Sequence, residues 1–373
     1  MKIKTIKTHR ITLKDSDLFL ILDKYLLSMK EGSILAITSK IIAICQGMVA
    51  DPAEHTKDKL AMQEAEYYLP RSLSVYNFML TVKHGTFIAS AGIDESNADG
   101  LFVLWPYNPQ GVANKVRAYL QKRFRLWHVG VIITDSKLTP LRSGVTGVAI
   151  VHSGFEALND YRGKNDLFRR KLKVTQANVM DGLAGATVLA MGEGSEATPL
   201  AVVEDIPFVK FQQRDPSKKE LFDLRISLWK DVYSPILKKV RWRKGDGGRP
   251  RKVLVFGIFD GLHEGHRFLL EQASQYGSHL IVVVGRDAVC KLLKHKTPRH
   301  IESQRLAMLK KNPLVSKALL GDIAQSSWNI IKRLKPDVIC LGYDQGALER
   351  SLRSWISKEG KEIILRRIAK LEK

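Results

Sequence analysis

The stretch Phe256-Gly257-Ile258-Phe259-Asp260-Gly261-Leu262-His263-Glu264-Gly265-His266 decides the fold of the C-terminal third of the chain. It follows the continuous apolar run of residues 252–256, which predicts a buried strand, and it precedes a predicted helix over residues 267–276. Further apolar runs predict strands at residues 279–284 and 337–341. Strand, helix and strand in this order indicate a βαβ unit. The sheet is then parallel, with its ligand site at the carboxyl ends of the strands.

The residue types in this loop suit a phosphate ligand. Gly257, Gly261 and Gly265 let the backbone approach a ligand closely, and the helix that follows offers unpaired N–H groups and the positive end of its dipole. His263 and His266 converge in the first turn of that helix, where they can stabilise charge on a triphosphate. A His-x-x-His pair also occurs in zinc sites, but no third ligand follows at a usual spacing. We therefore favour phosphate.

These residues resemble the cytidylyltransferase-like family, whose mark is G-x-F-D-x-x-H-x-G-H at the first βα turn. The resemblance implies an α/β, Rossmann-like parallel-sheet domain of the HUP nucleotidyltransferase type over residues 251–373. An acceptor phosphate would attack the α-phosphorus of a nucleotide and release pyrophosphate. The implied catalytic residues are His263, His266, Lys294 and Arg305, the last two to neutralise phosphates. The implied nucleotide-binding residues are Phe259, Asp260, Gly265, Gly342 and Asp344.

The nucleotide is suggested by residues 341–345, Leu-Gly-Tyr-Asp-Gln, which take the place of a G-x-D-Q segment in the family. This form is closer to archaeal-type flavin adenylyltransferases than to glycerol-phosphate cytidylyltransferases, so we expect ATP, with CTP as the alternative. Many members end in a Ser/Thr-rich segment that grips the phosphates. This chain has Arg366 and Arg367 near its end instead.

The N-terminal two-thirds has an α+β pattern with short strands expected at residues 33–37, 87–89, 101–105 and 129–134, and helices at 108–124 and 176–189. Three loops carry candidate chemistry: residues 91–97, the pair Asp135-Ser136 directly after an apolar strand, and the glycine-rich residues 191–196. A carboxylate beside a hydroxyl at a strand end suits a hard cation. Each loop taken singly is more often an ordinary turn.

Taken together and in order, these motifs resemble the ligase that adds glutamate to the precursor of the deazaflavin coenzyme F-420, over residues 11–201. The resemblance implies a GTP-dependent γ-glutamyl ligase that uses Mg²⁺ or Mn²⁺ and forms an intertwined homodimer. The implied metal ligands are Asp94, Asp135, Ser136 and Glu196; the nucleotide would contact Lys40, Asn97, Gly192 and Gly194, and Arg142 would bind anionic substrates. A deazaflavin and a folate-type acceptor both remain open, because residues 135–144 lack a Gly-Arg pair and a Trp that the family often has.

The joint between the two parts is the charged Gly/Pro segment of residues 243–250, preceded by a helix expected over residues 217–240 from its apolar spacing. We expect a ligase-like domain at residues 1–215, a helix and linker at 216–250, and the transferase at 251–373. The partners expected are nucleoside triphosphates, L-glutamate and a phosphorylated cofactor precursor. The alternative is a nucleotidyltransferase with a degenerate N-terminal module for dimerisation or ligand sensing.

Composition narrows the remaining classes. No apolar run reaches the 18 residues of a membrane span, and three scattered cysteines predict no disulfide framework and a cytoplasmic location. The formal net charge of +22 attracts polyanions in general, including nucleic acid and phosphorylated small molecules. Because no recognisable nucleic-acid-binding module carries that charge, we rank RNA binding low.

Overall fold

The structure, a computed structural model, describes residues 1–247, 252–274, 276–277, 279–288, 298–323, 327–361 and 363–369. The chain divides into two compact units, Met1–Gly248 and Arg249–Lys373. The first has mixed α+β architecture and the second is α/β with a parallel sheet, as the sequence predicts. Among the described residues, no helix combines the length and apolar character needed to cross a membrane.

The first unit is built on a five-stranded sheet in the order β1-β12-β2-β8-β9. Its strands are β1 (Lys2–Ile6), β12 (Leu200–Glu204), β2 (Ser33–Thr38), β8 (Val129–Leu138) and β9 (Val145–Ser153). β2 and β8 run parallel, with Thr38 opposite Thr134, whereas the other neighbours are antiparallel. Residues that follow Thr38 and Thr134 therefore emerge at the same edge of the sheet.

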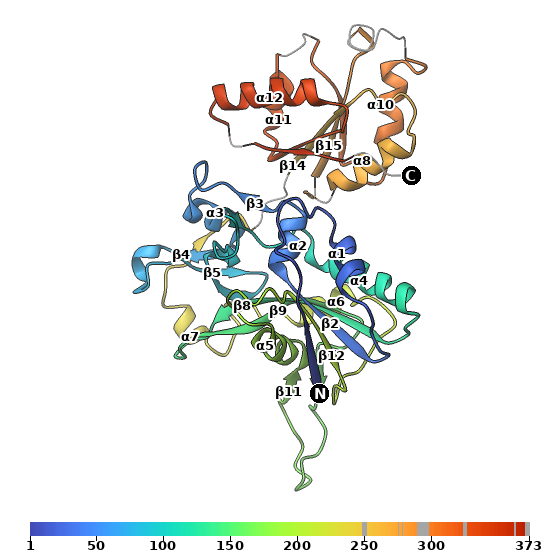
Figure 1. The fold of residues 1–373 in the computed structure, drawn as a ribbon. Helices are drawn as coiled ribbons and strands as arrows, with labels where there is room; N and C mark the ends of the chain where they lie inside the picture. Colours follow the sequence, from blue (N-terminus) through green and yellow to red (C-terminus); the bar gives the residue numbers. More distant parts are fainter. Residues whose placement is uncertain are drawn as a thin grey trace. The chain divides into compact units, whose positions relative to one another are not determined.

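Alternate residues of the central strands face opposite layers of helices. Ile34 and Ile132 pack against α5 (Val179–Met191). Leu35 and Ile133 lie in the core formed with α1 (Leu18–Tyr25), α2 (Ser39–Cys45) and α4 (Pro109–Phe124) (Figure 1). The helix expected at residues 108–124 is confirmed as α4. The helix expected at residues 176–189 begins later, at Val179, because residues 176–178 form a strand.

A smaller antiparallel sheet in the order β13-β4-β5-β6 completes the first unit with a second buried cluster that includes Leu60, Ile93 and Phe102. Its elements are β13 (Arg243–Lys244), β4 (Tyr67–Leu69), β5 (Leu80–Lys83) and β6 (Thr86–Ala89), with β3 (Val49–Ala50), β7 (Phe102–Val103), α3 (Lys57–Glu64) and the 3-10 turns η1 (Arg71–Leu73) and η2 (Ser90–Gly92). β10 (Leu158–Asp160) and β11 (Gln176–Asn178) pair at the base of a long projecting hairpin (Figure 1).

The single helix expected over residues 217–240 is wrong. The structure has two short helices, α6 (Lys218–Asp223) and α7 (Ser234–Leu237). Pro235, in the first turn of α7, has no N–H to donate and does not fit a helix interior. Val232 and Ile236, which would form the apolar stripe of the long helix, are exposed. Farther along, β13 pairs with β4, so this part of the expected linker is built into the first unit.

The second unit has five parallel strands in the order β16-β15-β14-β17-β18. They are β16 (Lys317–Leu320), β15 (His279–Val284), β14 (Lys252–Gly257), β17 (Val338–Leu341) and β18 (Ile364–Arg367). α8 (Glu264–Ser274) and α10 (Glu302–Lys310) pack on one face. α11 (Asn329–Leu334) and α12 (Gly346–Lys358) cover the other (Figure 1). The strands expected at residues 252–256, 279–284 and 337–341 are confirmed as β14, β15 and β17.

Candidate active sites

The first candidate site lies where the parallel pairing of β2 with β8 ends, at Thr38 and Thr134. Lys40 belongs to the first turn of α2, directly after β2, and Asp135 follows Thr134 on β8. The Lys40 ammonium lies 2.6 Å from Asp94 Oδ2. Two backbone hydrogen bonds between Asp94 and Val103, of 3.0 and 2.8 Å, fix the loop that carries Asp94.

The glycine-rich loop of residues 191–196 joins the same site. The side-chain amide of Asn97 donates to the Gly194 carbonyl oxygen at 2.9 Å. Glu196 turns back onto its own loop, where its carboxylate accepts from the Gly194 N–H at 2.8 Å. Three loops that lie far apart in the sequence are thus brought together around Lys40 and Asp94.

Asp135 is held by two donors. Its Oδ1 accepts from the Ser136 N–H at 2.8 Å, and its Oδ2 accepts from the indole N–H of Trp105. Burial raises the pKa of Asp135 to about 6, and the negative charge of Asp94 adds to this effect against the hydrogen bonds that lower it. The pKa of Glu193 is also raised, by partial burial and then by Asp94 and Glu196, although solvent screens much of the effect on this exposed loop.

Carboxylates whose pKa values are raised by burial and by acidic neighbours, as those of Asp135 and Glu193 are, belong to the kind of donor set that a hard divalent cation fits. The pKa of Glu193 responds to the charges of Asp94 and Glu196, which makes Glu193 a fourth acidic residue of this group beside Asp94, Asp135 and Glu196. Within the described residues, however, no three His, Cys, Asp or Glu side chains are already arranged as a metal site. The donor chemistry fits a divalent cation, whereas the ligand geometry is not assembled.

Two residues of this site were not predicted from the sequence, and one predicted residue, Arg142, makes none of the contacts that join the site. Trp105 looked like an apolar strand residue, and nothing local marks its indole N–H as a partner of Asp135. Glu193 could have been chosen from the acidic character of its loop. Arg142 is exposed in the turn between β8 and β9, seven residues beyond Asp135, and none of the contacts described above involves it.

The second candidate site is the loop that ends β14. The imidazole rings of His263 and His266 stack with centroids 3.7 Å apart. His266 Nδ1 lies 2.8 Å from the Gly261 carbonyl oxygen, which can only accept, so Nδ1 carries the hydrogen. The His266 N–H donates to Nδ1 of His263 at 3.3 Å, which leaves the hydrogen of that ring on Nε2. Both rings are therefore oriented by the loop itself.

Asp260 anchors this loop to the segment before α10. Its two carboxylate oxygens accept from the backbone N–H groups of Arg299, at 2.7 Å, and His300, at 3.0 Å. The His300 ring nitrogen Nδ1 lies 3.1 Å from the same carboxylate. Burial acts to raise the pKa of Asp260, but these hydrogen bonds outweigh it and the net pKa is lowered.

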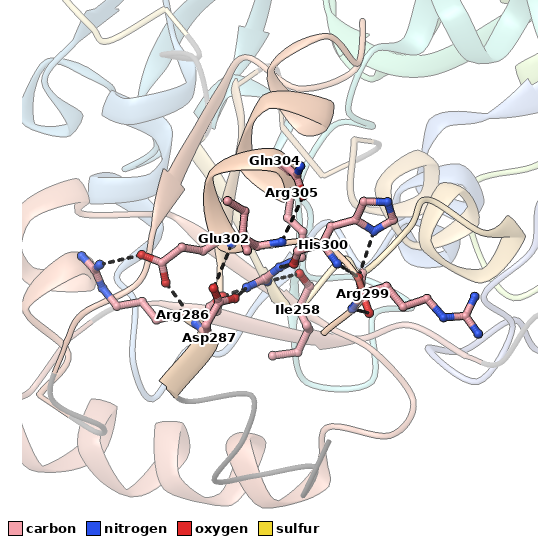
Figure 2. A network of polar contacts seen from close by, with 11 residues as sticks. Ile258, Arg286, Asp287, Arg299, His300, Glu302, Gln304 and Arg305 are labelled. Atoms are coloured by element: carbon pink, nitrogen blue, oxygen red, sulfur yellow. Dashed lines mark hydrogen bonds and ion pairs between the residues drawn. The ribbon is translucent and has the colours of Figure 1, made fainter. Parts of the chain in front are cut away.

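Arg305, expected to neutralise phosphate, lies in the interior of the second unit. Its side chain is fully buried, and Figure 2 shows its guanidinium inside a polar network. It donates to the carbonyl oxygens of His300, Ile258 and Gly285 and pairs with Asp287. These partners take four of its five N–H groups, so the Arg305 guanidinium holds the ends of β14 and β15 against α10.

The other nucleotide-binding residues expected in this unit differ in exposure. The Phe259 side chain is fully buried beneath His266, so only its backbone can face a ligand. Asp344 is exposed. Gln345 accepts from the Gly342 N–H at 2.8 Å and donates to the Phe256 carbonyl oxygen at 2.9 Å, which joins the ends of β17 and β14. Lys294 lies outside the described residues.

Comparison with known proteins divides the chain in the same way. Residues 5–205 match the family F420-0:Gamma-glutamyl ligase, and residues 254–372 match the Cytidylyltransferase-like family. A Coenzyme F420:L-glutamate ligase of Methanocaldococcus jannaschii is 33% identical over 214 residues, 52% of this chain and 86% of the relative. The enzyme of the same name from Methanopyrus kandleri is 35% identical over 190 residues, 47% of this chain and 75% of the relative.

Among solved structures, a lipopolysaccharide core biosynthesis protein from Thermoplasma volcanium is 36% identical. The match covers 33% of this chain and 99% of that chain, with a TM-score of 0.31.

Proposed function

We propose that this chain, which belongs to the F420-0:gamma-glutamyl ligase family, is a bifunctional enzyme of cofactor biosynthesis. Its second activity would come from the cytidylyltransferase-like domain that follows the ligase domain. The observation that supports the ligase activity is the meeting of Lys40, Asp94 and Asp135 at the point where the parallel pairing of β2 with β8 ends. Ligands of open sheets bind at such edges.

In the proposed ligase reaction, an acceptor carboxylate attacks the γ-phosphorus of GTP and forms an acyl phosphate and GDP. The amine of L-glutamate then displaces phosphate and forms the amide. Lys40 would stabilise the transferred phosphoryl group, and Asn97 and Gly194 would hold the loop that covers it. Mg²⁺ or Mn²⁺, held by Asp94, Asp135, Ser136 and an acidic residue of the 191–196 loop, would neutralise the GTP phosphates.

For the acceptor we propose a deazaflavin of the coenzyme F420 type in preference to a folate. The relatives that match the first unit are named for the coenzyme F420 reaction. Arg142, exposed in the β8–β9 turn, is proposed to meet an anionic group of that acceptor. If a folate stimulates phosphate release and a deazaflavin does not, the proposed acceptor is wrong and the ligase acts on folate.

In the proposed transferase reaction, an acceptor phosphate attacks the α-phosphorus of ATP and pyrophosphate leaves. His263, through its Nε2–H, would donate a hydrogen bond to a phosphate oxygen as negative charge grows there. His266, whose Nδ1–H is taken by Gly261, would donate from Nε2 as the imidazolium. The Gly342–Asp344 turn, at the end of the neighbouring strand β17, would contact the nucleotide. CTP is the alternative nucleotide, and thermal-shift measurements with ATP, CTP and GTP would distinguish them, because a ligand that binds the folded state raises its melting temperature.

The experiment that tests both activities uses two variants of the full chain. The ligase reaction is followed by acceptor-dependent release of phosphate from GTP with L-glutamate, and the transferase reaction by release of pyrophosphate. We expect Asp135→Asn to remove only phosphate release and His263→Ala to remove only pyrophosphate release. If no deazaflavin or folate acceptor stimulates phosphate release, the ligase proposal is wrong, and the transferase with an inactive N-terminal module is the better description.

Two further features are part of the proposal. We propose a homodimer formed through the first unit, which sedimentation of the full chain would test, and a cytoplasmic location. RNA binding, suggested by the net charge alone, predicts steeply salt-dependent binding that survives both Asp94→Ala and His263→Ala.

A further inference from the structure

Trp105 lies at the centre of a group of side chains behind the ligase site. It is 2% exposed, and its indole N–H donates to Asp135 Oδ2. The ammonium of Lys83 lies 5.2 Å from the centroid of the Trp105 ring and pairs with Glu64 at 2.8 Å. The His84 ring stacks on the same indole with an angle of 9° between the planes.

The backbone around Trp105 is shaped to admit the indole. Gly92 has a φ of +73° and precedes Asp94 by two residues, and a Cβ on Gly92 would overlap the indole nitrogen. Trp105 lies two residues after Val103, whose backbone is hydrogen-bonded to that of Asp94. One residue therefore packs against the loop of Asp94 and donates a hydrogen bond to Asp135.

We propose that Trp105 is a positioning residue of the ligase site, which fixes the carboxylate of Asp135 towards Asp94 through its indole N–H. The inference rests on the proposed function, in which both aspartates hold the divalent cation. The Asp135 carboxylate has one fixed donor at each oxygen, Ser136 on one side and Trp105 on the other. Without the Trp105 N–H, the Asp135 carboxylate can rotate out of the orientation in which it would bind the cation.

Lys83 and Glu64 extend the arrangement. Both are largely buried, so the ammonium is held beside the ring in surroundings where its attraction to the π-system is strengthened. Lys83 thereby restrains the indole, and the indole restrains the carboxylate. Partners in the outer shell of a metal site act in this way, and their loss typically weakens metal binding by about 10- to 100-fold.

The test measures Mn²⁺ binding to the full chain by electron paramagnetic resonance, without nucleotide. We expect Trp105→Phe, which keeps an aromatic ring and removes the N–H, to weaken Mn²⁺ binding at least about tenfold. Trp127→Phe is the matched control, because the Trp127 side chain is 69% exposed. Circular dichroism and the melting temperature without metal show whether each variant is folded.

Asp135→Asn separates this inference from the proposed function. If Asp135→Asn weakens Mn²⁺ binding and Trp105→Phe stays within twofold of the unmodified chain, Trp105 is not a positioning residue although the metal site stands. If Asp135→Asn has no effect, the proposed metal site itself is wrong. Should Trp105→Phe fail to fold, 3-benzothienylalanine at position 105 replaces the N–H by sulfur in a ring of the same shape, and it must reproduce the tenfold loss.

Discussion

The ammonium of Lys40 lies 2.6 Å from the Asp94 carboxylate and joins the end of β2 to the loop that follows β6. Lys40 also donates to the Ser96 carbonyl oxygen at 2.9 Å, so its side chain contacts the loop at two points and adds to the backbone hydrogen bonds between Asp94 and Val103. Burial acts to raise the pKa of Asp94, but Lys40 and Ser96 more than compensate and the pKa is lowered. The aspartate is therefore an anion at neutral pH, ready to bind a cation.

Replacement of Lys40 tests whether this pair serves the ligase reaction. Lys40→Met removes the charge that would stabilise the transferred phosphoryl group, and we expect acceptor-dependent phosphate release from GTP to fall by about 100-fold or more. Pyrophosphate release by the second unit should be unchanged. Lys57→Met is the control, because Lys57 forms a similar 2.9 Å pair with Glu95, the residue after Asp94. Equal losses in the two variants would argue against a specific role of Lys40.

In the proposed transferase reaction the two ring nitrogens of His266 have different tasks, Nδ1 to orient the ring and Nε2 to contact the phosphate. Nδ1 is hydrogen-bonded to the Gly261 carbonyl oxygen. An asparagine amide can take over that hydrogen bond but has no group at the position of Nε2. His266→Asn should therefore keep the loop folded and lower pyrophosphate release by about 100-fold or more. The phosphate-releasing reaction of the first unit is the internal control. A rate close to that of the unmodified chain would show that Nε2 takes no part in the reaction.

The sequence predicts the parallel sheet of the second unit because a buried strand, a glycine-rich loop, a helix and a second buried strand follow one another, and this order is typical of a βαβ unit. The sequence also indicates the three loops of the first site. The environment of Arg305 cannot be predicted from the sequence, since its partners include the backbone carbonyl oxygens of Ile258 and Gly285. Every residue has a backbone carbonyl group, so the residue type does not indicate which ones will accept a hydrogen bond. The helix expected over residues 217–240 fails for another reason, because spacing alone does not reveal Pro235 breaking the helix or the absence of a surface to bury its stripe.

The buried network of Arg305 predicts a stability effect confined to the second unit. Lys in place of Arg305 keeps the charge but has too few and differently directed donors for three carbonyl oxygens and Asp287. We expect Arg305→Lys to destabilise the second unit by about 3 kcal/mol or more, since buried acceptors and a carboxylate lose their partner. Hydrogen exchange resolved along the chain should show faster exchange in the strands of the second unit, β14 and β15 included, and unchanged exchange in the first unit. Arg353→Lys, on the exposed i,i+4 pair with Glu349, is the control.

His152 gives the first unit a defined dependence on pH. Its side chain is 2% exposed, and its Nδ1 has no hydrogen-bond partner among the described residues. Burial lowers the pKa of His152 to about 4. In the unfolded chain the His152 imidazole binds a proton with a pKa near 6.5, whereas in the folded chain its pKa is about 4. Stability is fully retained above pH 6.5 and falls between pH 6.5 and 4, by about 2 kcal/mol at pH 5.

Replacement of His152 should remove this fall. In His152→Leu the side chain cannot bind a proton in either state, so we expect the free energy of unfolding of the first unit to drop less between pH 7.5 and pH 5, by about 2 kcal/mol. Urea unfolding at the two pH values measures the difference. His279→Leu, at an exposed position of the second unit, should leave the pH dependence of the first unit unchanged. An equal drop in His152→Leu and the unmodified chain would mean that other groups, rather than this buried imidazole, couple folding to pH.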